Sequence, residues 1–333
     1  MRIKHAIFIA LLALALPVLA RTDSVRTDNP EAGETKARAY LDAALATIAD
    51  NAYYSERIDW STLRPELEQL AAGATRPEET HPAIRRALEA LGDNHSKLLP
   101  RSRVEKAASG PGSDSAGDSD SHSDHGIRAE TLGRVGYLSV PGFAFTNAAR
   151  SAEFSGTLQR HLDAQAAAGA CGWIIALRVN TGGNMYPMIQ GLSGLLGGET
   201  LGYFVRGEER TPWSARRFGV RDVDLHELEG GTSAPVAVLQ GRRTFSSGEA
   251  TLLSFIGRAN TRRFGEASGG LSTANRMFPL PDGAALVLTT SVMADRTGLA
   301  YGGPIEPDVQ IWDVSRTDIV ARQWVEAQPG CRD

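Results

Sequence analysis

Two short apolar segments constrain the fold of this chain most strongly. Trp173 to Val179 and Val236 to Gln240 are almost unbroken apolar runs, which is typical of strands buried on both faces of a sheet. A helical pattern over Asn147 to Ala168 precedes the first run. Because strands that alternate with helices form sheets covered on both sides, we predict an α/β core with a largely parallel sheet.

Further elements extend this alternation on both sides of the two runs. We expect strands at Val135 to Val140 and from Arg262 to Gly265, helices at Tyr186 to Leu196 and Gly248 to Gly257, and a hairpin of Arg276 to Pro279 and Ala284 to Ser291 around Pro281-Asp282-Gly283. The predicted catalytic core therefore spans residues 132–312, and residues 313–333 are expected to be a C-terminal tail.

The segment between residues 34 and 93 has the apolar spacing of helices. Apolar residues recur at helical spacing from Glu34, from Ser61 and over Pro82 to Leu91, which predicts a small helical cap over residues 34–93. Residues 108–127 are rich in Ser, Asp and Gly without an apolar period. Such a composition cannot bury a core, so we expect a disordered linker there.

The first 20 residues have the features of a secretory signal peptide. Basic residues at Arg2 and Lys4 precede the apolar run Ala6 to Pro17, and Val18-Leu19-Ala20 matches a small-x-small cleavage site. The run is shorter than the roughly 20 residues that span a membrane. An uncleaved anchor is the alternative, but we expect a periplasmic or extracellular mature protein.

The net charge and the cysteines limit the kinds of partner and cofactor that we expect. The formal net charge of -4 gives no basis for nucleic-acid binding, which usually needs a basic stripe. The two cysteines, Cys171 and Cys331, either form a disulfide in an oxidising compartment or stay as separate thiols. Neither has a second Cys or a His at ligand spacing, so no metal site is expected, and no organic cofactor is implied.

Ser246 is the strongest candidate nucleophile. It lies in Thr244-Phe245-Ser246-Ser247-Gly248-Glu249, between a predicted buried strand and a predicted helix. A serine at such a turn lies beside helix N-terminal N–H groups, which stabilise a developing oxyanion. The alternative is that Ser246 and Ser247 merely cap the helix, a role that serine favours.

Two further segments carry residues suited to catalysis. Gly182 and Gly183 follow a buried strand, where paired glycines allow close backbone approach to a substrate. His95 lies in Leu91-Gly92-Asp93-Asn94-His95-Ser96, and histidine is the side chain best suited to accept a proton at neutral pH. Alone, each segment also fits a structural role.

The order of these segments resembles the C-terminal-processing (tail-specific) and tricorn-like serine peptidases of family S41. The segment ending in His95-Ser96 resembles that family's LGDxHS, Leu177 to Gly183 resembles LRxNxGG, and Ser246 to Glu249 resembles its nucleophile segment. The later Leu280 to Gly283 and Pro304 to Asp308 resemble LPDG and GIxPD. The resemblance implies a crotonase-like core beside a helical cap, with Ser246 as nucleophile and N–H groups of Ser247 and Gly182 or Gly183 as oxyanion donors.

The chain departs from the tail-specific branch at the base. Leu271 stands where that branch has its lysine, and no lysine follows Lys106, so a Ser–Lys dyad is excluded. The resemblance to the tricorn-like branch implies instead that His95 is the general base for Ser246. The place of that branch's orienting glutamate falls near Tyr301, and Asp295 and Glu306 do not match it cleanly, so the third member is left open.

The usual PDZ module is also missing. Only about 35 residues separate Ser96 from Arg134, too few for such a domain. We therefore predict a secreted serine peptidase with a polypeptide substrate and no stable membrane insertion after signal cleavage. The alternatives are a peptide- or ligand-binding protein that has lost catalytic power on the same fold, and an esterase that uses the same acyl-enzyme chemistry.

Overall fold

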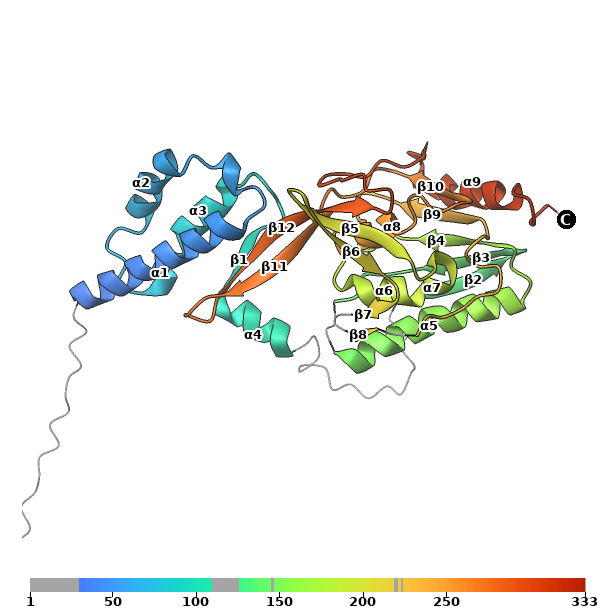
Figure 1. The fold of residues 1–333 in the computed structure, drawn as a ribbon, viewed down its shortest axis with the longest axis horizontal. Helices are drawn as coiled ribbons and strands as arrows, with labels where there is room; N and C mark the ends of the chain where they lie inside the picture. The colour runs from blue at the N-terminus through green and yellow to red at the C-terminus, as the bar shows by residue number, and fades with distance from the viewer. Residues whose placement is uncertain (1–29, 110–125, 145–146, 219–220, 223, 333) are drawn as a thin grey trace, which may run out of the picture.

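A computed structural model describes residues 30–109, 126–144, 147–218, 221–222 and 224–332. Within them a helical domain lies at one end and an α/β core at the other, with a long β-hairpin reaching from the core to the helices (Figure 1). The expected signal peptide and most of the expected linker lie outside these residues. None of the described helices has the length and apolar character needed to cross a membrane.

Helices form in the N-terminal segments where the apolar spacing predicted them. The helices are α1 (Pro30–Asn51), α2 (Trp60–Leu70) and α3 (His81–Ala90), with 3-10 turns at Ser55–Arg57 and Pro77–Thr80. The predicted apolar stripe of α1, including Leu41, Leu45 and Ile48, is buried. Asp59 caps α2 by accepting from two backbone N–H groups, which supplies partners that the first helical turn lacks.

The core sheet has six strands in the order β13-β10-β9-β4-β3-β2. The strands are β2 (Arg128–Leu132), β3 (Val135–Ser139), β4 (Gly172–Ala176), β9 (Val236–Gln240), β10 (Thr261–Gly265) and β13 (Val309–Gln310). Only β2 pairs antiparallel. Every residue of β4 and β9 is buried, as predicted for strands covered on both faces.

Helices cover both faces of this sheet, which confirms the α/β class. One face packs on α5 (Ala148–Ala167), α6 (Met185–Gly191), α7 (Ser193–Leu196) and α8 (Ser247–Leu253), and the other packs on α9 (Val314–Glu326). Neighbours in β4 divide between the faces, since Ile175 joins the first cluster and Ile174 the second.

A second sheet links the core to the helical domain. It contains β1 (Lys97–Leu99), β5 (Thr200–Arg206), β6 (Glu209–Ser214), β11 (Thr273–Pro279) and β12 (Ala285–Asp295), while β7 (Arg217–Phe218) and β8 (Arg221–Asp222) form a separate pair. Leu286 and Leu288 of β12 are buried in the same cluster as the helices α1 and α3. The hairpin therefore fixes the helical domain to the core (Figure 1).

Several predicted bounds were wrong in detail. The strand predicted to run to Val179 ends at Ala176, because the chain there turns into the glycine segment and Val179 is 49% exposed. The helix predicted over Tyr186 to Leu196 is two helices. The segment expected only as a tail contains α9. Cys331, which follows that helix, forms a disulfide with Cys171, the residue directly before β4.

Candidate active site

Ser246 has a strained backbone at the turn between β9 and α8. Its φ of 51° and ψ of -116° lie in a region that side-chain-bearing residues rarely adopt. Such conformations persist only where the surroundings enforce them, and they cluster at functional sites. The residue is half-buried. A simple helix cap needs no such strain.

The surroundings enforce this turn through backbone contacts. We call residues 244–249 the nucleophile loop. The Thr244 hydroxyl donates to the Leu177 carbonyl at 2.8 Å, and the Phe245 N–H donates to the Asn180 carbonyl at 2.9 Å. Asn180 is fully buried. These contacts join the loop to the segment that follows β4, because β4 and β9 are adjacent and parallel.

The paired glycines lie directly against the nucleophile loop. Gly182 has φ +93° and Gly183 φ +114°, values that favour glycine. A side chain at Gly182 would stand 3.0 Å from the Ser246 Cβ, and one at Gly183 would overlap the Phe143 carbonyl oxygen. Only glycine therefore permits this approach.

Some backbone N–H groups beside Ser246 donate a hydrogen bond within the protein, and others have no acceptor there. The latter are called uncommitted donors. The Gly182 N–H donates to Asn180 Oδ1 at 3.0 Å. The Gly183 and Ser247 N–H groups have no hydrogen-bond acceptor among the described residues, while the Ser247 hydroxyl donates to the Gly183 carbonyl at 2.6 Å. Of the two glycines considered from sequence, Gly183 is thus the one with a donor to spare for an oxyanion.

Glu249 fixes the nucleophile loop from inside the core. Its side chain is fully buried. One carboxylate oxygen accepts from the Ser246 N–H at 2.8 Å, and the other accepts from the Ser268 hydroxyl at 2.6 Å and the Gly270 N–H at 2.9 Å. Burial raises the pKa of this carboxyl, and these hydrogen bonds oppose that rise. The contacts tie the backbone of the candidate nucleophile to the segment 268–273.

His95 lies on a second loop, residues 93–96, which we call the base loop. Asp93 holds it by accepting from the backbone N–H groups of His95 at 2.9 Å and Ser96 at 2.6 Å, and from the Ser96 hydroxyl at 2.8 Å. The Asn275 side chain donates to the His95 carbonyl at 3.2 Å. The base loop is therefore fixed mainly by side chains.

The imidazole of His95 is oriented by Thr273, at the start of β11. Its Nδ1 lies 2.7 Å from the Thr273 hydroxyl oxygen. In the tautomer protonated at Nδ1, this contact leaves Nε2 unprotonated and able to accept a proton. Burial lowers the pKa of His95 to about 4, and the positive charge of Lys97 acts in the same direction. The ring is therefore neutral at neutral pH, the state that a general base requires.

One segment of chain carries the contacts of both candidates. Within residues 268–273, the Ser268 hydroxyl and the Gly270 N–H donate to the Glu249 carboxylate, and the Thr273 hydroxyl contacts His95. No hydrogen bond joins Ser246 to His95 directly. In structures without substrate, catalytic hydrogen bonds are often long and shorten when substrate binds.

Among the described residues no acidic side chain forms a hydrogen bond with the imidazole of His95, since the bond that Asp93 accepts from His95 comes from its backbone N–H. The Tyr301 hydroxyl donates to Asp295 at 2.8 Å, and Asp295 further accepts from the loop at residues 297–299. The side chain that contacts the imidazole is that of Thr273. Sequence reasoning missed it because nothing in its flanks distinguishes it, whereas Glu249 stood inside the nucleophile motif and had a visible signal.

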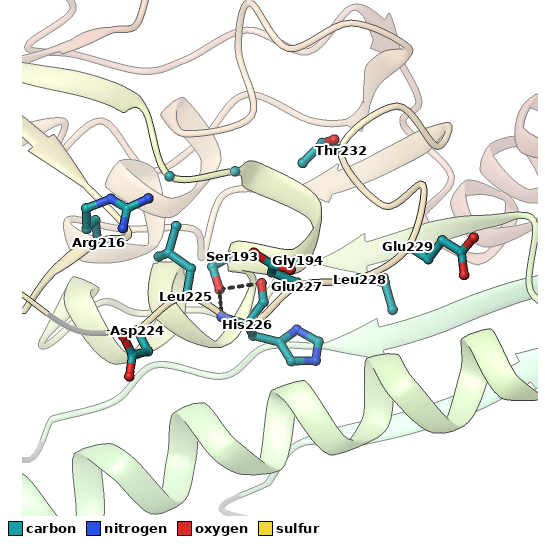
Figure 2. A pocket seen from close by; sticks show the side chains of 12 residues that line it. Ser193, Gly194, Arg216, Asp224, Leu225, His226, Glu227, Leu228, Glu229 and Thr232 are labelled. Atoms are coloured by element: carbon teal, nitrogen blue, oxygen red, sulfur yellow. Dashed lines mark hydrogen bonds between the residues drawn. The ribbon is translucent and has the colours of Figure 1, made fainter.

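A cavity of about 230 Å³ opens beside His95. Its wall includes Thr273 and Leu271, and the helical domain contributes Tyr54 and Arg57. A larger cavity of about 800 Å³ lies elsewhere, around Ser193 and His226 (Figure 2). There the Ser193 hydroxyl contacts only the His226 backbone, so no nucleophile–base pair forms. Among the described residues no cluster of three His, Cys, Asp or Glu side chains is arranged to hold a metal ion.

Comparison with known proteins relates this chain to a family of peptidases. A sequence profile of peptidase family S41 matches residues 134–311. A nisin-resistance protein of Lactococcus lactis subsp. lactis is 27% identical over 304 residues, which cover 87% of each chain. A lipoprotein structure from Streptococcus agalactiae has a TM-score of 0.71 at 25% identity and covers 96% of this chain and 99% of its own.

A processing protease is similar to this chain in fold alone. The photosystem II D1 C-terminal processing protease superimposes with a TM-score of 0.60 at 15% identity, over 83% of this chain and 93% of its own. Because the S41 profile covers more than half of the chain, the protein belongs to peptidase family S41. The resemblance read from the sequence motifs is thereby confirmed.

Proposed function

We propose that this chain is a secreted serine peptidase in which Ser246 is the nucleophile and His95 the general base. The observation that carries the proposal is the strained Ser246 beside two uncommitted N–H groups. A neutral His95, oriented by Thr273, supplies the proton acceptor. The family membership implies a polypeptide substrate. The N-terminal sequence implies export, and N-terminal sequencing of the exported protein tests this by showing whether it begins at Arg21.

In the proposed reaction, His95 Nε2 removes the hydroxyl proton of Ser246 as its oxygen attacks the peptide carbonyl carbon. The Ser247 and Gly183 N–H groups donate to the resulting oxyanion. Collapse of the intermediate breaks the C–N bond, and His95 delivers the proton to the leaving amine. Water, activated by the same imidazole, then hydrolyses the acyl-enzyme and releases the acid product.

The test is cleavage of a polypeptide, read by mass spectrometry. The relative named a nisin-resistance protein makes nisin the first natural substrate to try, beside an unstructured peptide mixture. We expect wild type to produce fragments, Ser246→Ala to produce none, and His95→Ala to be at least about 100-fold slower. Retained binding without any cleavage by wild type would favour the binding-protein alternative, and turnover of esters alone would favour an esterase.

A further inference from the structure

The cavity beside His95 is built from two parts of the molecule that are distant in sequence. His95, Leu271 and Thr273 contribute one side, and Tyr54 and Arg57 of the helical domain contribute another. Gly270 also lines this cavity, and its N–H donates to the same Glu249 carboxylate that accepts from the Ser246 N–H. The cavity wall is therefore connected to both candidate catalytic residues. A group that enters it from a bound peptide would meet the helical domain as well as the core.

Arg57 is the available charge in this cavity. Its guanidinium carbon stands 3.7 Å from the centroid of the Tyr54 ring, a cation–π contact that holds the side chain in place. Among the described residues no carboxylate lies within 4.0 Å of its nitrogens, although Arg178 and Arg263 each have such a partner. The hydrogen-bond donors of Arg57 are therefore not used by an acid of the described chain.

The other charged group of the cavity is already committed. Asp93 accepts three hydrogen bonds from the base loop, so few of its lone pairs remain for a ligand. His95 is neutral at neutral pH. An entering cation would thus find no free carboxylate, whereas an entering carboxylate would find the planar donor fork of Arg57, which matches it in geometry.

We propose that Arg57 is a specificity residue that selects peptides presenting a carboxylate beside the scissile bond. This rests on the proposed peptidase function. The cavity of about 230 Å³ is large enough for an acidic side chain or a C-terminal carboxylate. Both of these groups present a carboxylate to Arg57, and the experiment below distinguishes a side-chain carboxylate from a C-terminal one.

The experiment uses hexapeptide mixtures in matched pairs. One pair carries Asp or Asn at each position in turn, and the other carries a free or an amidated C-terminus. Wild type is assayed for cleavage, and Ser246→Ala is assayed for binding by affinity selection and mass spectrometry, so that selectivity is measured even without turnover. Each assay is repeated after Arg57→Gln. Arg85→Gln is the matched control, because Arg85 is an exposed arginine of the same helical domain outside the cavity.

We expect wild type to prefer the carboxylate member of one pair by about 10-fold, the lower end for a charged hydrogen bond at a partly open site. Arg57→Gln should abolish that preference, leave hydrolysis of neutral peptides unchanged and leave labelling of Ser246 by a fluorophosphonate intact. Arg85→Gln should retain it. An equal response to both members of every pair, or a preference that survives Arg57→Gln, would overturn the proposal. Loss of all cleavage with selective binding retained would overturn only the peptidase function.

Discussion

The nucleophile loop and the base loop are held in place by different kinds of interaction. Around Ser246, backbone groups of adjacent parallel strands and the buried Glu249 fix the turn. Around His95, the main supports are the side chains of Asp93, Asn275 and Thr273. Backbone supports belong to the fold itself, whereas side-chain supports can be removed singly. The two loops should therefore respond differently to substitution.

The largest effect is expected from Gly183→Ala on the nucleophile side. A Cβ there overlaps the Phe143 carbonyl oxygen, so the segment must shift and carry its N–H away from the oxyanion position. Removal of one oxyanion donor costs about 10²- to 10³-fold in rate. Turnover of a peptide substrate measures it. Gly303→Ala is the control, because no atom lies within 4 Å of its added Cβ, and equal activity of both variants would refute the assignment.

Glu249→Ala should damage stability as well as rate. It leaves the Ser246 and Gly270 N–H groups and the Ser268 hydroxyl without their acceptor. Each buried unsatisfied donor costs about 1–3 kcal/mol, so the loss of one acceptor for three donors should lower the free energy of unfolding by at least about 3 kcal/mol. Denaturant titration measures this loss. Glu105→Ala, which removes a solvent-exposed ion pair with Arg101, should leave the transition in place.

Thr273→Val should separate rate from stability on the base side. The substitution keeps the shape but removes the hydroxyl 2.7 Å from His95 Nδ1. We expect kcat/KM to fall by about 10- to 100-fold through misorientation of the base, with a loss of only about 1 kcal/mol in unfolding free energy. Thr273→Ser keeps the hydroxyl and should restore most of the rate. If Ser and Val variants behave alike, the hydrogen bond does not orient His95.

The smallest effect is expected on the pH profile. Because the pKa of His95 is lowered to about 4, its basic form should be lost, and kcat/KM with it, only as pH falls through about 4. Lys97 contributes to this lowering, so Lys97→Gln should raise the pKa and move the acidic limb upward. Lys106→Gln, in α4 (Arg101–Ser109), is the control. An acidic limb near pH 6.5 in wild type would contradict the environment described for His95.

How well the sequence predicted each helix or strand depends on how completely that element is buried. The strand β9 was predicted with its observed bounds, because full burial leaves an unbroken apolar run. The strand β6 was missed because most of its residues are exposed. Helix α9 was missed because the residues it buries are Thr317, Ala321 and Val325, which are small or weakly apolar and give little periodic signal.

Within the site, local motifs were informative and long-range contacts were not. Ser246, Gly183 and His95 each stand in a recognisable segment, but their roles remain proposals. The contact from Thr273 spans 178 residues of sequence, and no local rule links a threonine to a distant histidine. The choice between Gly182 and Gly183 likewise needed the structure, since it depends on the side chain of Asn180.

The central claim is that Ser246 is activated by His95. Its most direct test is labelling of the mature protein with a fluorophosphonate probe, followed by intact mass in wild type, Ser246→Ala and His95→Ala. The account predicts one adduct on wild type, none on Ser246→Ala, and labelling at least about 100-fold slower on His95→Ala. Absence of an adduct on folded wild type, or labelling of His95→Ala at the wild-type rate, would contradict it.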